Sequence, residues 1–167
     1  NQIIEYESSL HKSSSDEHIK TWDEISFIVR ELKNKDKKII FTNGCFDILH
    51  IGHVKYLEKT KGFGDILILG LNSDESVRRL KGENRPINSQ IDRAYILASL
   101  EVIDYVVIFE DDTPLDLIRL IQPDVLVKGG DYEGKEIAGQ EIAKEVRIVK
   151  FIDDKSTTKT IERIQKS

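Results

Sequence analysis

Short apolar runs alternate with longer amphipathic stretches along the chain. Apolar runs of this length, flanked by polar or turn residues, are typical of strands that are buried on both faces of a sheet. Their alternation with intervals of helix length predicts an α/β fold, with a parallel sheet of about five strands and helices on both faces. The expected strands span residues 38–42, 66–71, 105–109, 124–127 and 146–149.

The intervals between these strands have helical spacing. A stripe of apolar residues over positions 19–32, mostly three positions apart, predicts an N-terminal helix over residues 19–36. Thr113 and Pro114 begin another helix, because proline is favoured in a first turn. The loops that follow the strands should gather along one rim of the sheet, where ligands of such sheets bind.

The chain divides into a polar beginning and an α/β domain. Residues 1–18 are polar and have the composition of a flexible N-terminal segment or interdomain linker. Residues 37–167 are expected to form the α/β domain itself. The chain contains no methionine, so Asn1 is not a natural translation start, and we expect either a trimmed N-terminus or a piece of a longer protein.

Composition sets only broad limits. The 167 residues are enough for one domain with a hydrophobic core but few for two. Hydrophobic residues make up 39% and charged residues 33%, and no apolar run approaches the ~18 residues of a membrane span. The net charge of −5 argues against nucleic acid as a partner. With the single cysteine, Cys45, these features indicate a cytoplasmic protein with small-molecule partners and no membrane association.

Two of the four histidines, His50 and His53, follow the first expected strand at this rim. If a helix begins directly after His50, a spacing of three places both rings on one face of its N-terminus. The free N–H groups and partial positive charge of a helix N-terminus suit phosphate, and imidazole N–H groups can stabilise the charge that grows on a phosphorus under attack. Two alternatives remain open, a metal site completed by Cys45 and Asp47 or a solvated pair.

The segment of residues 44–53 resembles the Gly-x-Phe-Asp-x-x-His-x-Gly-His signature of the cytidylyltransferase-like nucleotidyltransferases, a superfamily with a Rossmann-like fold. Its members join a nucleoside triphosphate to a phosphorylated small molecule and release pyrophosphate. Further motifs are similar to one subfamily, the adenylyltransferase domains that make ADP-activated heptose for lipopolysaccharide, and the resemblance covers roughly residues 37–165. These motifs lie at residues 72–82, 85–86, 92–93, 125–131 and 156–158.

The resemblance implies a phosphate-binding cation after the second strand. Arg78, Arg79 and Lys81 are the candidates, because cations on a rim loop can offset the charge of a triphosphate and of its leaving pyrophosphate. The family pattern favours Lys81. The alternative is a solvated basic helix end, with Arg78 or Arg79 facing water.

Three further residues near the signature have contrasting interpretations. Arg93 begins a helix, where a cation is unfavourable unless an anion lies near; the family places a phosphate contact there, and a salt bridge to Asp92 or Glu101 is the alternative. Asp47 is interpreted as an acceptor that fixes the loop, because an ionised phosphate nucleophile needs no base. Cys45 is interpreted as a loop residue, since no covalent intermediate is required.

The stretch Lys128-Gly129-Gly130-Asp131-Tyr132 follows the fourth strand. Paired glycines allow a base or ribose to approach the backbone, and Asp131 can accept hydrogen bonds from hydroxyl groups. An ordinary glycine-rich turn explains the same sequence. Tyr132 departs from the tryptophan that is common in relatives, so stacking on the base is expected to differ.

Ser156, Thr157 and Thr158 open the last expected helix. A helix N-cap explains them adequately, and in the family the same stretch also donates hydroxyl and N–H groups to the phosphates, so both roles can hold. Lys155 stands where many relatives have arginine, and a lysine lacks the bidentate fork of the guanidinium.

Together the motifs imply transfer of AMP from ATP to D-glycero-β-D-manno-heptose 1-phosphate, with Mg²⁺ accompanying the ATP. The alternatives are a cytidylyltransferase acting on glycerol 3-phosphate or another small phosphate, and a nucleotide-binding module without catalysis. No metal ligand is expected from the protein. The expected catalytic residues are His50, His53, Lys81 and Arg93, and the expected nucleotide-binding residues are Thr42, Asn43, Gly44, Cys45, Phe46, Gly129, Asp131, Ser156, Thr157 and Thr158.

The resemblance also bears on partners. In many bacteria this domain is the C-terminal half of a bifunctional protein, behind a ribokinase-like heptose kinase, and residues 1–18 then correspond to the interdomain linker. A stand-alone enzyme with a trimmed N-terminus is the alternative. Because relatives are commonly dimers or larger, a homo-oligomer is expected.

Overall fold

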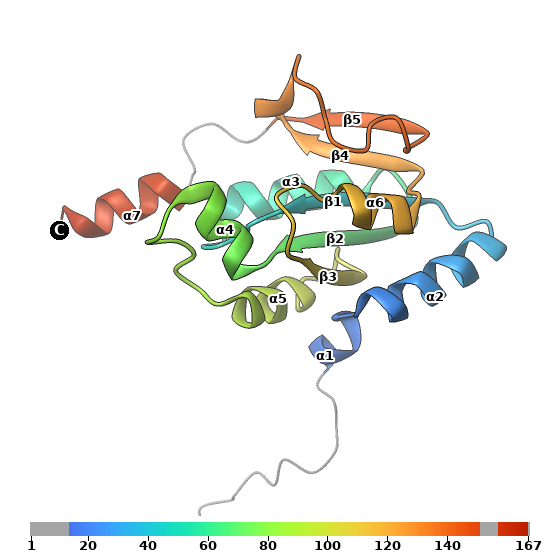
Figure 1. The fold of residues 1–167 in the computed structure, drawn as a ribbon, viewed down its shortest axis with the longest axis horizontal. Coiled ribbons are helices and arrows are strands. Elements are labelled where there is room, and N and C mark those ends of the chain that lie inside the picture. Colours follow the sequence, from blue (N-terminus) through green and yellow to red (C-terminus); the bar gives the residue numbers. More distant parts are fainter. Residues whose placement is uncertain (1–13, 151–156, 167) are drawn as a thin grey trace, which may run out of the picture.

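The computed structural model describes residues 14–150 and 157–166 of the chain. Within them, five parallel strands form one sheet in the order β3-β2-β1-β4-β5 (Figure 1). The chain moves outward from β1 on one side and then on the other, which is the order of a Rossmann-like fold and confirms the predicted class. The strands are β1 Ile39–Gly44, β2 Ile66–Asn72, β3 Tyr105–Phe109, β4 Val125–Gly129 and β5 Glu145–Val149.

Helices cover both faces of the sheet, as predicted. Apolar side chains of α3 (Ile51–Lys61) and α5 (Gln90–Ala98) belong to one hydrophobic cluster, and those of α2 (Trp22–Asn34) and α6 (Leu115–Ile121) belong to a second. None of the helices in the described residues is long and apolar enough to cross a membrane. The remaining helical elements are α1 Ser14–His18, α4 Asp74–Lys81, the 3-10 helix η1 Gly130–Tyr132 and α7 Thr157–Gln165.

The two clusters explain why the strands are uninterrupted apolar runs. In β1, Ile40 belongs to the α3/α5 cluster, whereas Ile39 and Phe41 belong to the α2/α6 cluster. All three side chains are fully buried. Because successive residues of a strand point to opposite faces, a strand covered on both sides stabilises the fold through every side chain, by roughly 1.5–3 kcal/mol for each large one.

The N-terminal segment differs from its prediction. Residues 14–18, which the composition assigned to a flexible segment, form α1, and Ile19 makes a parallel β-bridge with Val106 instead of beginning the long helix. The N–H of Lys20 donates to the Val106 carbonyl at 2.9 Å. The segment therefore covers part of the outer edge of β3, whose backbone groups would otherwise face water. Residues 1–13 of the predicted flexible segment lie outside the described residues.

The helix α2 begins three residues later and ends two residues earlier than predicted. Thr21 caps it: its hydroxyl accepts from the N–H of Glu24 at 3.2 Å, and the Glu24 carboxylate accepts from the N–H of Thr21 at 2.8 Å. The Trp22 indole donates to the Ile108 carbonyl at 2.9 Å and joins the helix to β3. Apolar spacing alone missed this start, because Ile19 continues the stripe although it lies in an extended segment.

The central strands β1 and β4 part toward their carboxyl ends. Their ladder stops at the pair formed by Phe41 and Leu126, although both strands continue. The carbonyl of Val127 accepts side-chain hydrogen bonds instead, from the hydroxyl of Thr42 at 3.0 Å and that of Tyr56 at 3.4 Å. The strand order reverses at this point, and ligands of such sheets bind in the crevice that results.

Two residues on α2 test whether this helix belongs to the folded core. Ile25 is fully buried in the α2/α6 cluster, whereas Phe27 is 60% exposed. Ile25→Ala is expected to lower the free energy of unfolding by about 2–5 kcal/mol because it leaves a cavity, and Phe27→Ala by about 0.5 kcal/mol or less. Urea denaturation followed by circular dichroism measures both, and equal small losses would contradict the packing of α2.

Candidate active site

A cleft of about 510 Å³ opens where β1 and β4 part. It lies on the rim at the carboxyl ends of the strands, where the sequence predicted a ligand, and its volume is typical of small-molecule sites. The loop after β1 lines one side, and the ends of β4 and α4 line others. Eight residues predicted for the site line the cleft: Asn43, Gly44, Cys45, Phe46, His53, Lys81, Gly129 and Asp131.

The loop after β1 turns sharply at its start. A Cβ atom at Gly44 would lie 2.9 Å from the ring of Phe46, so only glycine leaves the ring its place. Phe46 has a φ of 45°, in the left-handed region that bulky side chains rarely adopt. Its ring centroid is 5.4 Å from that of His53. The turn therefore places a buried aromatic ring against a predicted catalytic histidine, and backbone strain of this kind clusters at functional sites.

His50 and His53 together cap the N-terminus of α3. The N–H of Gly52 donates to Nδ1 of His50 at 3.1 Å, and the N–H of His50 donates to Nδ1 of His53 at 3.3 Å. The two ring centroids are 3.9 Å apart. Because each Nδ1 accepts a hydrogen bond, a neutral ring carries its proton on Nε2. The helix cap thus selects the tautomer in which Nε2 carries the proton.

The two histidines differ in their relation to the cleft. His53 lines it, whereas His50 does not and stacks against His53 at the helix start. Burial, reinforced by the charges of His50 and Lys81, lowers the pKa of His53 to about 4, so this ring is neutral at neutral pH. The alternative of a metal site finds no ligand set, since the described residues contain no group of three or more His, Cys, Asp or Glu side chains that could hold an ion.

Asp47 fixes the loop, as its interpretation from the sequence proposed. Its carboxylate accepts from the N–H groups of Ile87 (2.8 Å) and Asn88 (2.9 Å) and from Nε of Arg85 (2.9 Å). Burial alone would raise the pKa of this carboxyl, but these hydrogen bonds outweigh burial and hold the pKa below its usual value. Three protein donors bond to its two oxygens and the lowered pKa makes it a weak base, which fits an anchoring role.

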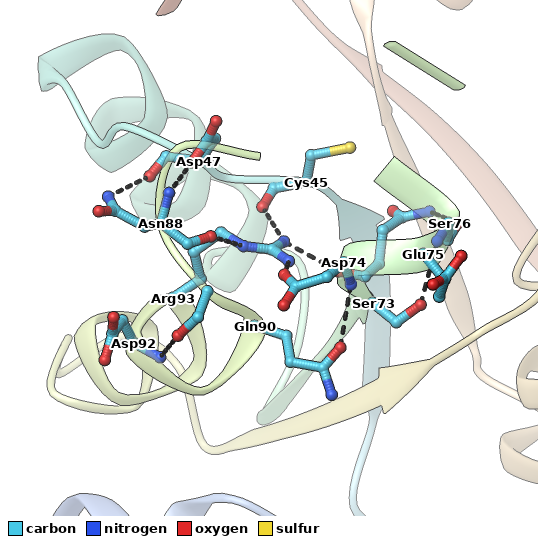
Figure 2. Close-up of polar contacts among 12 residues, drawn as sticks. Cys45, Asp47, Ser73, Asp74, Glu75, Ser76, Asn88, Gln90, Asp92 and Arg93 are labelled. Carbon is cyan, nitrogen blue, oxygen red and sulfur yellow. Dashed lines mark hydrogen bonds and ion pairs between the residues drawn. The ribbon is translucent and has the colours of Figure 1, made fainter. Parts of the chain in front are cut away.

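Figure 2 shows the guanidinium of Arg93 between the loop after β1, the end of β2 and the start of α5. Nη1 donates to the carbonyls of Cys45 and Asn72, both at 2.8 Å. Nε donates to the Asn88 carbonyl at 3.0 Å, and Nη2 pairs with the Asp74 carboxylate at 2.8 Å. The guanidinium therefore joins three segments that are distant in the sequence.

This placement indicates a structural role for Arg93 in place of the phosphate contact that the family resemblance implied. Its side chain is 0% exposed and does not line the cleft, because protein acceptors surround it. Arg93 does form a salt bridge, as the alternative interpretation proposed, but its partner is Asp74 and not Asp92 or Glu101. Spacing along the chain suggested the nearest acids, whereas only the fold brings the start of α4 against α5.

Of the three cations predicted after β2, the structure singles out Lys81. Arg78 pairs with Glu75 at 2.9 Å and Arg79 pairs with Asp112 at 2.8 Å, on the exposed side of α4. Lys81 ends α4 and lines the cleft. The solvated interpretation therefore fits Arg78 and Arg79, and Lys81 is the cation that a bound triphosphate could meet.

Three other predicted residues have different placements. Thr42 does not line the cleft, because its side chain is fully buried and its hydroxyl bridges β1 to β4. Cys45 lines the cleft within the loop, and burial raises the pKa of its thiol despite the cations nearby, so the thiol stays protonated at neutral pH. Thr158 is exposed on α7. Ser156 and the side chain of Thr157 lie outside the described residues.

Lys128 is a residue to which the sequence analysis assigned no role of its own. Its side chain lines the cleft yet is only 5% exposed, and Nζ donates to Oδ1 of Asn43 across the gap between β4 and β1. Nζ also lies 4.9 Å from the ring centroid of Tyr132. Burial lowers the pKa of Lys128 to about 8, and the charge of Asp131 only partly opposes that effect. The one signal in the sequence is a cation at the end of an otherwise apolar strand.

Asp47→Asn tests the anchor of the loop. We expect it to lower the free energy of unfolding at pH 7 by about 3 kcal/mol, because it breaks a buried, hydrogen-bonded ion pair. The folded pKa lies below the unfolded value of ~3.9, so this stabilisation is present above about pH 4 and is lost as the pH falls through the folded pKa. Urea denaturation between pH 7 and pH 3 should therefore show the gap between wild type and variant narrowing.

A matched control is Asp116→Asn, which breaks the exposed pair with Arg119 at 2.7 Å. Exposed pairs of this kind contribute less than about 1 kcal/mol. A similar loss in both variants, or a gap for Asp47→Asn that does not change with pH, would contradict the anchoring role.

Comparison with known proteins extends these observations. The cytidylyltransferase-like family model matches residues 41–165. The chain is 68% identical over 166 residues to the Bifunctional protein HldE of Aliarcobacter butzleri (strain RM4018) and 63% identical over 164 residues to that of Sulfurimonas denitrificans. These alignments cover 99% and 98% of this chain but 35% and 34% of the relatives, so the chain spans about a third of their length.

Two solved structures are similar. The lipopolysaccharide core biosynthesis protein from Thermoplasma volcanium GSS1 has a TM-score of 0.56 and 27% identity, covering 70% of this chain and 97% of that one. Pantoate-beta-alanine ligase from Francisella tularensis has a TM-score of 0.58 and 17% identity, covering 89% and 76%, and indicates the fold alone. The family match includes the loop after β1, both histidines and the ends of β2 and β4, and the chain therefore belongs to the cytidylyltransferase-like family.

Proposed function

We propose that this domain transfers AMP from ATP to D-glycero-β-D-manno-heptose 1-phosphate and releases pyrophosphate. The observation that carries the proposal is the stacked pair of imidazoles at the N-terminus of α3, beside the cleft at the switch point of the sheet. A helix N-terminus attracts phosphate, and neutral imidazole N–H groups can donate to developing charge. The motif at residues 125–131 and the relatives named Bifunctional protein HldE support the heptose acceptor.

In the proposed reaction, ATP lies across the rim with its adenosine near Gly129 and Asp131 and its phosphates toward His50 and His53. An oxygen of the acceptor phosphate attacks the α-phosphorus. One P–O bond forms as the bond to the β-phosphate oxygen breaks, and pyrophosphate leaves with the electron pair of that bond. The attacking oxygen is already ionised, so no side chain has to remove a proton, and positioning and charge stabilisation supply the rate.

The side chains around the cleft take separate roles in this proposal. Lys81 is proposed to meet the leaving pyrophosphate, since it lines the cleft together with His53 and its charge acts on that ring. Arg93 positions the loop after β1 through the Cys45 carbonyl, because its guanidinium does not reach the cleft. Ser156, Thr157 and Thr158 are proposed as further donors to the phosphates, on the strength of the family motif alone.

Mg²⁺ is proposed to arrive with the nucleotide. Nucleotidyltransferases generally use Mg²⁺ with their nucleotide substrates, and the ion would offset part of the negative charge of the phosphates. Among the described residues no group of three or more His, Cys, Asp or Glu side chains is arranged to hold an ion. We therefore assign no protein ligand to Mg²⁺ and derive no step through it.

We also propose that this domain acts within a longer bifunctional protein, behind a heptose kinase, and that it forms a homo-oligomer. The first proposal is supported by the name of the relatives and by their length, of which the chain covers about a third. The homo-oligomer is proposed because relatives in the family to which the signature belongs are commonly dimers or larger.

Replacing the histidines tests the chemistry. His53→Ala and His50→Ala are each expected to reduce the turnover number by about 10²-fold or more, the size of one lost donor to a developing oxyanion. His50→Asn is more informative, because asparagine is a good N-cap and keeps α3 capped while removing the imidazole. Pyrophosphate release measures turnover, and thermal unfolding reports the cap.

We expect His50→Asn to unfold near the wild-type temperature yet to lose turnover as His50→Ala does. Lys59→Ala, an exposed change on the same helix, serves as the control and should leave turnover unchanged. Near-normal turnover in the double variant His50→Ala/His53→Ala would sink the assignment of these residues.

The substrate assignment is tested by a grid of pyrophosphate-release assays. ATP and CTP are each combined with D-glycero-β-D-manno-heptose 1-phosphate and with glycerol 3-phosphate. We expect release above background only for ATP with the heptose phosphate. Release with CTP and glycerol 3-phosphate would replace the proposed substrates but keep the reaction, and no release with any pair would indicate a binding module without catalysis.

A further inference from the structure

Two Lys or Arg side chains are buried among the described residues, and they differ in how their charge is balanced. Arg93 has a carboxylate partner, Asp74, at 2.8 Å. Lys128 has the neutral amide oxygen of Asn43, and within residues 14–150 and 157–166 no carboxylate forms an ion pair with it. A buried cation without a counter-charge is costly, so a position of this kind favours an anion from outside the protein.

The surroundings of Lys128 also favour the binding of an anion. The ammonium sits where β1 and β4 part and lines the cleft, so a ligand in the cleft reaches it without any rearrangement of the sheet. The ring of Tyr132 lies 4.9 Å from Nζ and covers it on one side. The charge of Asp131 raises the pKa of Lys128 but only partly offsets the effect of burial. An anionic ligand in the cleft would supply the negative charge that Asp131 alone does not.

The two lysines that line the cleft, Lys128 and Lys81, come from opposite sides of β1. Lys81 ends α4, which follows β2, whereas Lys128 lies on β4, and β2 and β4 flank β1 on opposite sides. Lys128 lies instead against Asn43 at the end of β1. In phosphoryl and nucleotidyl transfer, the attacking and leaving oxygens lie roughly in line on opposite sides of the reacting phosphorus. Two separated cations suit the two anions of such a reaction.

We propose that Lys128 binds the phosphate of the acceptor substrate, held in place by Asn43, opposite the pyrophosphate that leaves toward Lys81 and the histidines. This inference rests on the proposed function and deepens it. It assigns the acceptor class as a phosphomonoester whose dianion lies against a buried ammonium. Lys128 is then a binding residue for the acceptor, and its contribution should be specific to that substrate.

The first experiment compares Lys128→Met with wild type in the pyrophosphate-release assay. Methionine is close to lysine in length and removes the charge without burying a new polar group. We expect the KM for D-glycero-β-D-manno-heptose 1-phosphate to rise about 10- to 100-fold, the effect of losing one charge-assisted hydrogen bond, while the KM for ATP stays within about twofold. An equal rise in the KM for ATP, or no rise in either KM, would overturn the assignment.

A second variant guards against a misfolded Lys128→Met protein. Asn43→Asp keeps Lys128 but places a carboxylate against its ammonium, so the cation is neutralised inside the protein. It is expected to show the same selective rise in the KM for the heptose phosphate. Thermal unfolding of both variants checks the fold, and Lys37→Met, an exposed lysine at the other end of the sheet, is the control for a general charge effect.

A binding experiment keeps the inference separate from the proposed function. The protein is saturated with α,β-methylene-ATP and titrated with inorganic phosphate, with phosphate binding followed by ³¹P line broadening. Wild type is expected to bind phosphate at least about tenfold more tightly than Lys128→Met. Equal binding would overturn the role of Lys128 even if turnover is normal. Binding lost in the variant, with no turnover of the heptose phosphate by wild type, would overturn the proposed substrate but keep the anion site.

Discussion

The parting of β1 and β4 is the constraint on which the site depends. A parallel sheet satisfies its backbone through ladder hydrogen bonds, and where the ladder stops at Phe41 and Leu126 the freed groups need other partners. The hydroxyls of Thr42 and Tyr56 supply them by bonding to the carbonyl of Val127, well inside the sheet. These bonds give the Val127 carbonyl, which lies beyond the last ladder pair, two side-chain donors. The cleft lies at this gap, lined by the loop after β1 and the end of β4.

Two side chains of opposite charge, Asp47 and Arg93, hold the loop that begins at Gly44. Asp47 is tied to the backbone of residues 87–88 and to Arg85, and Arg93 is tied to the Cys45 carbonyl and to three other acceptors. Neither depends on a ligand for its partners, so both hold the loop before a substrate arrives. A loop fixed in this way keeps the histidine pair in one orientation, and preorganised donors of this kind need no rearrangement as charge develops. The net negative charge of the whole chain does not conflict with a phosphate site, because two lysines line the cleft itself.

Much of the fold follows from local pattern. Strands covered on both faces are continuous apolar runs, and the five expected runs match the five strands to within a residue or two. The alternation of strands with helices was enough to predict that the loops after the strands lie along one rim of the sheet. The N-terminal region shows the limit of this reasoning. Ile19 fits the helical stripe, yet it lies against β3, because an unpaired strand edge offers backbone partners that periodicity does not report.

The sequence by itself determined the fold class, the rim that carries the site, the histidine pair at a helix start and the anchoring role of Asp47. Each of these depends on neighbours in the chain or on a compact motif. Only the tertiary structure decided that Thr42 faces the interior, that Arg93 pairs with Asp74, and that Lys128 lies buried at the cleft with no ion pair to any carboxylate of the described residues. The physical reason is that charge balance and burial are set by contacts between segments far apart in the chain, which spacing along the sequence does not reveal.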